Sequence, residues 1–165
     1  MHKISIETAK ELAHLLVKID GIKGVDIFGS VAREGYGADF DLIILTNQEK
    51  AQEWWVNAKM RIRQRSFFTI LYHKLKKTIP FFETVFEGKK RKRGISIASD
   101  VFKYDLVSFF ENYKPKIKVD TIVLPENWRD GGVVNYEVFN KLKPSPDTGT
   151  IRFFERIAKD TKRLA

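Results

Sequence analysis

The feature that most constrains how this chain can fold is the stretch IFGSVAREGYGADFDLIIL, residues 27–45. A short apolar segment, 25–28, leads into a glycine-serine pair and a glycine-containing loop, and a second apolar segment, 40–46, follows. The second segment is apolar on both faces beyond Asp41, which is typical of a central strand covered on both sides. Asp39 and Asp41 therefore place two carboxylates at the entrance of a buried strand.

The remaining hydrophobic pattern predicts a mixture of helices and strands. In chain order we expect a helix capped by Ser5 and stopped at Asp20-Gly21, mostly helix over 48–79, a hairpin over 81–98 with its tip at 89–93, a helix over 99–113, a strand over 116–124, and helices over 133–142 and 150–164. This order predicts one α+β domain over 1–165, with a mixed β-sheet flanked by helices. Residues 83–115 are predicted to be an inserted basic hairpin and helix region, and 133–165 to form C-terminal helices.

The composition is that of a globular protein and not of a disordered one, with 43% apolar and 31% charged residues. No apolar run approaches membrane-spanning length, and the charged N-terminus does not resemble a signal peptide. Because the chain has no cysteine, a disulfide framework and a thiolate metal site are excluded. We therefore expect a cytoplasmic protein without a membrane partner.

Positive charge is concentrated in one region of the chain. Residues 59–93 contain twelve of the 30 Lys and Arg residues but only two of the 21 Asp and Glu residues. Such a region predicts a surface for a polyanion such as nucleic acid, or equally a solvated charged surface. Its densest part could contact a phosphate backbone, solubilise a turn or dock an acidic partner protein. This part is the run Lys89, Lys90, Arg91, Lys92 and Arg93.

The acidic residues at the strand ends suggest a metal site. Residues two apart on a strand project to the same face, so we expect Asp39 and Asp41 to point in one direction. Two such carboxylates repel each other unless a cation lies between them, and Mg²⁺ prefers carboxylate and phosphate oxygens. The predicted third strand carries Asp120 between apolar residues; if it reaches the same point, three carboxylates can hold two metal ions for phosphoryl transfer. Asp100 and Asp105 lack this strand context.

The pair Gly29-Ser30 directly after the first predicted strand suggests a phosphate contact. A glycine lets backbone N–H groups approach a phosphate without a Cβ in the way, and the Ser30 hydroxyl can donate to the same oxygen. The segment is not a Walker A loop, because no Gly-Lys-Ser/Thr follows it.

Together these segments resemble the signature of the DNA polymerase β-type nucleotidyltransferase superfamily, and most closely that of the minimal nucleotidyltransferases. FGSVAR resembles the Gly-Ser-x-x-Arg segment of these proteins, and DFDLIIL resembles their Asp-x-Asp strand. VDTIVLPENW resembles their third-strand Asp followed by Pro-Glu. The resemblance covers residues 24–46 and 116–128.

The resemblance implies a nucleotidyltransferase-like sheet and a Mg²⁺-dependent enzyme that transfers an NMP from an NTP to a hydroxyl, with release of pyrophosphate. It implies that two Mg²⁺ ions, or Mn²⁺ in their place, are bound by the catalytic residues Asp39, Asp41 and Asp120. It also implies that the nucleotide is held by Gly29 and Ser30, assisted by Arg33.

The acceptor stays open at this point. The basic region favours a nucleic-acid 3′ end, whereas the minimal type suggests a toxin–antitoxin pair in which a toxin protein is adenylylated; a small molecule is a third choice. Two positions depart from the family pattern: Glu34 stands where a Gly is common, and Ala38 where a Ser precedes the first Asp. These departures favour an alternative, a catalytically inactive nucleotidyltransferase fold that binds nucleic acid or a partner, for example as an antitoxin. A plain nucleic-acid-binding protein is a further alternative.

Aromatic pairs recur at Trp54-Trp55, Phe67-Phe68 and Phe81-Phe82. Aromatic residues of this kind usually pack in a core, and we expect the same here. For the tryptophan pair, a platform on which a base stacks is the alternative.

Overall fold

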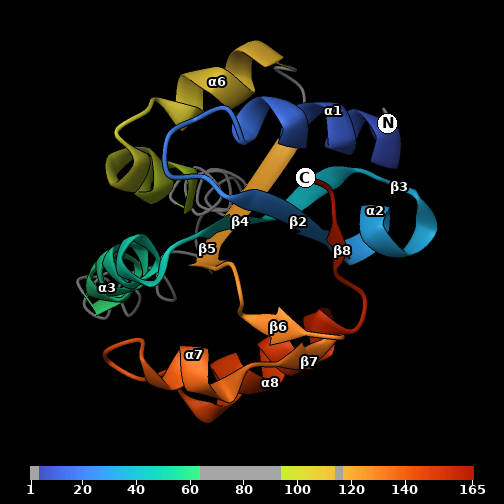
Figure 1. Cartoon of the computed structure of the whole chain (residues 1–165). Helices are drawn as coiled ribbons and strands as arrows, with labels where there is room; N and C mark the ends of the chain where they lie inside the picture. The colour runs from blue at the N-terminus through green and yellow to red at the C-terminus, as the bar shows by residue number, and fades with distance from the viewer. Residues whose placement is uncertain (1–3, 64–93, 114–116) are drawn as a thin grey trace, which may run out of the picture.

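A computed structural model describes residues 4–63, 94–113 and 117–165 of the chain. Within these residues the fold is α+β, with seven helices around a mixed four-stranded sheet (Figure 1). The sheet contains β2 (Gly24–Phe28), β4 (Asp39–Thr46), β5 (Lys118–Pro125) and β8 (Lys162–Arg163). Their spatial order is β5-β4-β2-β8; β4 and β5 run parallel, whereas β2 is antiparallel to both β4 and β8.

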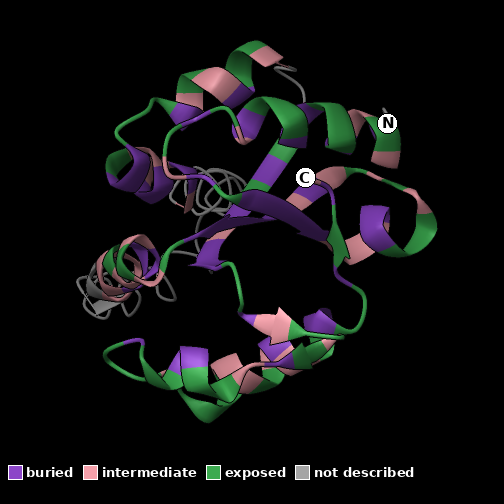
Figure 2. Ribbon diagram, in the orientation of Figure 1, coloured by how far each residue is buried: buried purple, intermediate pink, exposed green. Residues whose placement is uncertain are grey.

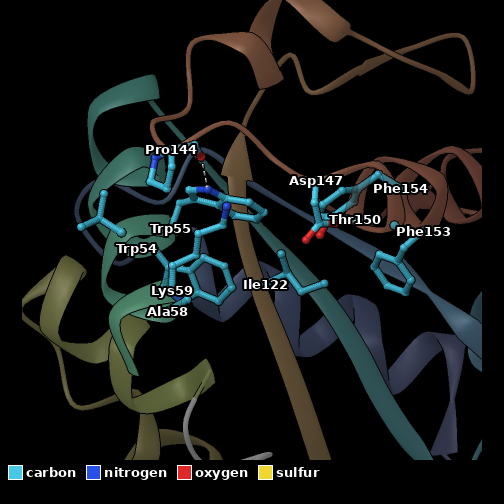
Figure 3. Close-up of a pocket in the computed structure, with 12 residues that line it drawn as sticks. Trp54, Trp55, Ala58, Lys59, Ile122, Pro144, Asp147, Thr150, Phe153 and Phe154 are labelled. Atoms are coloured by element: carbon cyan, nitrogen blue, oxygen red, sulfur yellow. Dashed lines mark hydrogen bonds between the residues drawn. The ribbon is translucent and has the colours of Figure 1, made fainter. Parts of the chain in front are cut away.

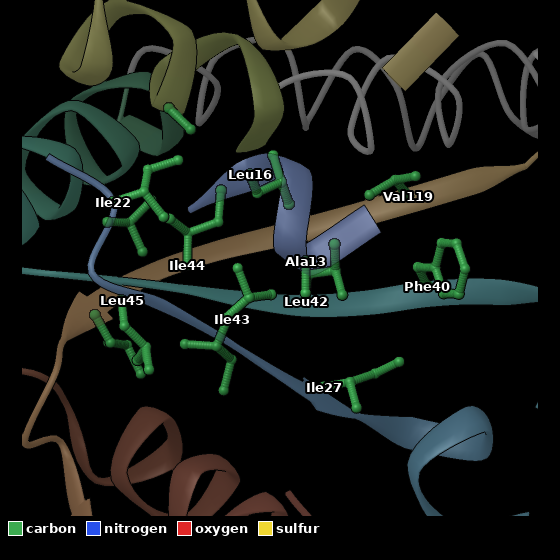
Figure 4. Close-up of a cluster of buried hydrophobic side chains, with 14 of the residues drawn as sticks. Ala13, Leu16, Ile22, Ile27, Phe40, Leu42, Ile43, Ile44, Leu45 and Val119 are labelled. Carbon is green, nitrogen blue, oxygen red and sulfur yellow. The ribbon is translucent and has the colours of Figure 1, made fainter. Parts of the chain in front are cut away.

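The central position of β4 confirms the prediction made from its unbroken apolar run. Every residue of this strand after Asp41 is buried (Figure 2). Side chains alternate along it: Leu42 and Ile44 point toward α1, and Ile43 points to the opposite face (Figure 4). Such a strand needs cover on both faces, and the helices provide it.

One face of the sheet is covered by α1 (Ile6–Leu16), a helix over 94–102, and α6 (Leu106–Tyr113). The predicted cap of α1 is confirmed, because the Ser5 side chain accepts a hydrogen bond from the Thr8 backbone N–H at 3.3 Å. The buried residues of these helices include Ala9, Leu12, Ala13, Leu16, Ala98, Val101, Leu106 and Phe110.

The other face is covered by the C-terminal segment, which lies below the sheet in Figure 1. It contains a two-stranded sheet of β6 (Arg129–Asp130) and β7 (Val133–Val134), followed by α7 (Tyr136–Asn140) and α8 (Thr148–Ala158). Phe154 of α8 packs against Phe139 with ring centroids 4.9 Å apart and against Trp128 at 6.0 Å. This aromatic cluster gives the layer its own apolar contacts. The helix α3 (Gln48–Arg63) follows β4 at the edge of the molecule.

Two predictions for the residues before β5, a hairpin arm and a helix, need correction. Residues 94–98, expected as one arm of a hairpin, are helical as part of 94–102. Ile95, Ala98 and Val101 are buried at a spacing of three, so this short apolar segment follows the helical period and not the strand period. The single helix expected over 99–113 is broken near Lys103, whose φ is +53°, and α6 restarts at Leu106.

The C-terminal predictions were also too simple. The helix expected over 133–142 is shortened to α7, because the Asn135 side chain caps it by accepting from the Val138 N–H at 3.5 Å. The helix expected over 150–164 is α8, and it ends at Ala158. The chain then returns to the main sheet as β8, next to β2. The predicted helix over 48–79 is confirmed as far as Arg63; its remainder, and most of the predicted hairpin, lie outside the described residues.

The segment between β2 and β4 is more regular than the predicted loop. It contains a short helix, α2 (Gly29–Glu34), which ends at Gly35 with a left-handed φ of +81°. The strand β3 (Tyr36–Gly37) follows and pairs with β1 (Ile4–Ser5). This pairing ties the polar segment to the start of α1, and a hydrogen bond from the Ile6 N–H to the Gly35 carbonyl at 2.8 Å adds to it.

Candidate active site at the ends of β2, β4 and β5

Strand register brings the three predicted carboxylates to one face of the sheet. Asp41 of β4 lies directly beside Asp120 of β5, and Asp39 lies beside Lys118. Since neighbours in register project to the same face, Asp39, Asp41 and Asp120 share the face that the C-terminal segment covers. Asp39 and Asp41 are half-buried and Asp120 is exposed, so solvent reaches this group.

Gly29 lies against the Asp41 carboxylate. It follows β2 directly, where Phe28 is the register partner of Asp41, and its φ is +78°, in the left-handed region that favours glycine. A Cβ built on Gly29 would overlap Asp41 Oδ2. Two independent features of the sequence, the glycine and the carboxylate, are therefore parts of one local arrangement.

Ser30 and Arg33 extend the same arrangement along α2. A Cβ on Gly37 would overlap the Ser30 hydroxyl, so the backbone of β3 passes close to this side chain. Ser30 is half-buried and Arg33 is exposed. Three residues apart on a helix, they lie on the same side of it. The structure thus brings Gly29, Ser30 and Asp41 together, with Arg33 one turn further.

We compared these residues with the needs of a Mg²⁺ site in two respects, the spacing of the backbone and the arrangement of the side chains. The backbone fits, because adjacent strands are about 4.8 Å apart and Asp41 and Asp120 are in register, with only hard oxygen ligands. The side chains are not arranged as a ligand set: among the described residues, no group of three or more His, Cys, Asp or Glu could hold a metal ion. Asp39, Asp41 and Asp120 each interact with other groups in the structure. For all three carboxylates to bind metal together, their side chains would have to reorient.

A buried carboxylate that the sequence analysis overlooked lies on the same face. Asp26 of β2 is 0% exposed. Arg163 Nε donates to it at 2.6 Å, Trp128 Nε1 at 3.2 Å and Arg129 Nε at 3.4 Å. A charged residue within an otherwise apolar strand was the available signal for such a partnered group. Asp26 joins β6 and β8 to the central sheet and so holds the C-terminal segment in place.

Phe153 of α8 connects this segment to the candidate site. Its ring packs edge-on against Phe28 with centroids 6.0 Å apart, and Phe28 is the register partner of Asp41. Arg156 lies over the Phe153 ring at 5.6 Å. The face that carries the carboxylates is therefore continuous with an aromatic surface from α8.

The other residues considered in the sequence analysis have other roles or lie elsewhere in the structure. Asp105 caps α6, accepting from the Ser108 hydroxyl at 2.6 Å and the Ser108 N–H at 3.0 Å, and these bonds lower the pKa of Asp105. Asp100 and His14 are exposed. The expected core packing of the tryptophan pair is confirmed, since Trp54 and Trp55 are each 7% exposed. The run Lys89, Lys90, Arg91, Lys92 and Arg93 lies outside the described residues, so its predicted role stays a prediction.

No helix in the described part of the chain is both long and apolar enough to cross a membrane. Comparison with protein-family models, with curated proteins and with solved structures finds no match to this chain.

Proposed function

We propose that this protein is a Mg²⁺-dependent nucleotidyltransferase that moves an NMP from an NTP to a hydroxyl acceptor and releases pyrophosphate. The observation that carries the proposal is the register of Asp41 beside Asp120, with Gly29 packed against the Asp41 carboxylate. A glycine that leaves room for backbone N–H groups beside paired carboxylates combines a phosphate contact with a metal-ligand set.

In this proposal Asp39, Asp41 and Asp120 would hold the magnesium ions after their side chains reorient. Magnesium held there would supply a lowered pKa for the attacking hydroxyl and stabilisation of the leaving pyrophosphate. Gly29 and Ser30 hold the triphosphate beside Asp41. The acceptor oxygen forms a bond to the α-phosphorus, the bond from that phosphorus to the pyrophosphate oxygen breaks, and Asp120, the most exposed of the three carboxylates, takes the hydroxyl proton.

The test is incubation with each α-labelled NTP and Mg²⁺, with pooled short RNA, pooled DNA and cell extract as acceptors. Asp41→Asn removes one ligand charge from the site, and Asp20→Asn, at an exposed position after α1, is the matched control. We expect the wild type and Asp20→Asn to transfer label and Asp41→Asn to lose the transfer. Transfer that is equal in all three proteins would contradict the proposal.

A second candidate is a nucleotidyltransferase-like module that binds nucleic acid or a partner protein without catalysis. It is favoured by the side-chain arrangement, in which the described carboxylates do not form a metal-ligand set, and by Glu34 and Ala38. This candidate predicts no label transfer to any acceptor and no Mg²⁺-dependent nucleotide binding. A nucleic-acid acceptor and an adenylylated toxin remain proposals under the first candidate.

A further inference from the structure

A cavity of about 900 Å³ lies between α3 and the segment 144–154, on the sheet face that carries the three carboxylates. Its volume is in the range of pockets that hold small organic molecules. In Figure 3 the two tryptophans of α3 stand on one side, Phe153 and Phe154 on the other, and Ile122 of β5 between them. Rings and aliphatic groups therefore form most of its wall.

Two of its walls continue into the candidate active site. Ile122 follows Asp120 by two residues on β5, so both side chains project to the same face, about 7 Å apart along the strand. Phe153, on the opposite wall, packs against Phe28, the register partner of Asp41. A molecule that fills the cavity can thus present one end to the carboxylates.

The polar groups around the cavity are mostly engaged within the protein. The indole N–H of Trp55 donates to the Pro144 carbonyl at 3.0 Å, and that of Trp54 donates to the Gly94 carbonyl at 3.3 Å. Lys59 Nζ donates to the Ser145 carbonyl at 3.1 Å and lies 5.2 Å over the Trp55 ring. The tryptophans accordingly offer ring faces and not hydrogen-bond donors.

The two charged residues of the cavity wall, Lys59 and Asp147, do not favour an anionic ligand. Asp147 caps α8 by accepting from the Thr150 N–H at 2.7 Å, and this bond lowers the pKa of Asp147, which keeps the carboxylate charged. The positive charge of Lys59 also lowers the pKa of Asp147, so the two opposite charges offset each other and the cavity offers no net positive charge to a phosphate chain. A nucleobase would fit the rings, but most of its polar edge atoms would lose hydrogen bonds to water without finding partners. The cavity best suits an uncharged molecule with few polar groups.

We propose that this cavity is the acceptor subsite, and that the acceptor is an uncharged alcohol carrying an aromatic or fused apolar ring. The inference rests on the proposed nucleotidyltransferase function and narrows its acceptor to a small molecule. The ring lies between Trp54 and Phe153, and the hydroxyl points toward Asp120. The alcohol oxygen then bonds to the α-phosphorus, pyrophosphate leaves with the electron pair of the broken bond, and the hydroxyl proton passes to Asp120.

The three tryptophans allow a direct test by NMR. Each indole N–H gives its own resonance in a proton–nitrogen spectrum, assigned by replacing each tryptophan with Phe. The probe is naphthalenemethanol, which has a fused ring and a hydroxyl. We expect it to shift the resonances of Trp54 and Trp55 with saturation. Trp128 is fully buried, bonds to Asp26 at 3.2 Å and meets the cavity only through Phe154, so it should shift much less and also reports that the protein is folded.

Two variants with the same added ring separate the cavity from the rest of the surface. Ala58→Phe adds a phenyl group to the cavity wall, whereas Leu15→Phe adds it on the exposed side of α1, across the sheet. We expect Ala58→Phe to weaken probe binding about tenfold or more, which corresponds to about 1.4 kcal/mol, and Leu15→Phe to leave it unchanged.

Three results would overturn the inference. The first is no shift of Trp54 and Trp55, or an equal shift of Trp128. The second is the same pair of shifts with Mg²⁺–ATP alone, which would assign the cavity to the nucleobase and leave the proposed function intact. The third is probe binding by a protein that transfers no label and does not bind Mg²⁺–ATP, which would contradict the proposed function itself. Label transfer from α-labelled ATP to naphthalenemethanol, lost in Ala58→Phe and kept in Leu15→Phe, supports both.

Discussion

Replacing Asp26 should destabilise this protein more than any surface charge change. Its carboxylate is fully buried and accepts three hydrogen bonds, from Trp128, Arg129 and Arg163, all more than 100 residues away in the chain. In Asp26→Ala the indole N–H of Trp128, itself 0% exposed, loses its partner. Both arginines lose their counter-charge at the same time.

The magnitude follows from the exposure of the partners. Removing one member of a buried ion pair typically costs about 3–5 kcal/mol. Here the arginine side chains are 19% and 51% exposed, so water can rehydrate them in part and the cost falls toward the lower end. We expect Asp26→Ala to lower the free energy of unfolding by about 3 kcal/mol. For a chain of this size that corresponds to a decrease in Tm of about 6–12 °C.

The assay is urea unfolding followed by circular dichroism, with Glu126→Ala as the control. Glu126 pairs with Lys23 at 3.0 Å, but these side chains are about half exposed, and such surface pairs contribute below about 1 kcal/mol. Asp26→Asn keeps one acceptor oxygen and should fall between the two. If Asp26→Ala costs no more than Glu126→Ala, the buried network does not hold the C-terminal segment in the way described.

Two further predictions concern the site and the cap of α8. Gly29→Ala would press a methyl group against the Asp41 carboxylate and should weaken Mg²⁺–ATP binding about tenfold or more in calorimetry. Gly35 is the control, because its φ is similar but a Cβ built on it would meet no atom within 4 Å. If Gly35→Ala weakens binding as much as Gly29→Ala, contact with Asp41 is not the cause. The pKa of Asp147 is lowered chiefly by the backbone N–H of Thr150, so the stability from this cap is complete above the ordinary carboxyl pKa and is lost as pH falls through the lower folded-state pKa. In thermal unfolding across that acidic range, the Tm of Asp147→Asn should depend less on pH than that of the wild type, because the neutral amide oxygen still caps the helix. If the variant and the wild type have the same pH profile, the cap does not cause the pH dependence.

Hydrophobic period was enough to predict three of the four strands of the main sheet, β2, β4 and β5. The central strand over 40–46 and the strand that carries Asp120 are confirmed, because each has an apolar pattern that decides its face locally. The Ser5 cap is also confirmed, because a serine before an apolar helical repeat is a local signal. The common face of Asp39 and Asp41 follows from the same alternation. The parallel register that puts Asp120 beside Asp41 does not, since it depends on the path of the chain between β4 and β5.

The missed elements lack a local apolar pattern, and some of them depend on partners far along the chain. β8 is only two residues long and exists because Arg163 reaches Asp26 and the chain end pairs with β2. The helix α2 follows a strand without any apolar repeat to mark it, and its end at Gly35 requires a left-handed residue that the sequence suggested only as a loop. The tryptophans were correctly expected in the core, but their second role as a cavity wall comes from α8, about 90 residues further along the chain.

The central claim is that Asp39, Asp41 and Asp120 bind magnesium against a nucleotide triphosphate. The most direct measurement is a calorimetric titration of the protein with α,β-methylene-ATP, in Mg²⁺ and in EDTA, for the wild type, Asp41→Asn and Asp20→Asn. The account predicts Mg²⁺-dependent binding that Asp41→Asn weakens about tenfold or more and that Asp20→Asn leaves unchanged. Equal binding with and without Mg²⁺, or equal affinity in the wild type and Asp41→Asn, would contradict it.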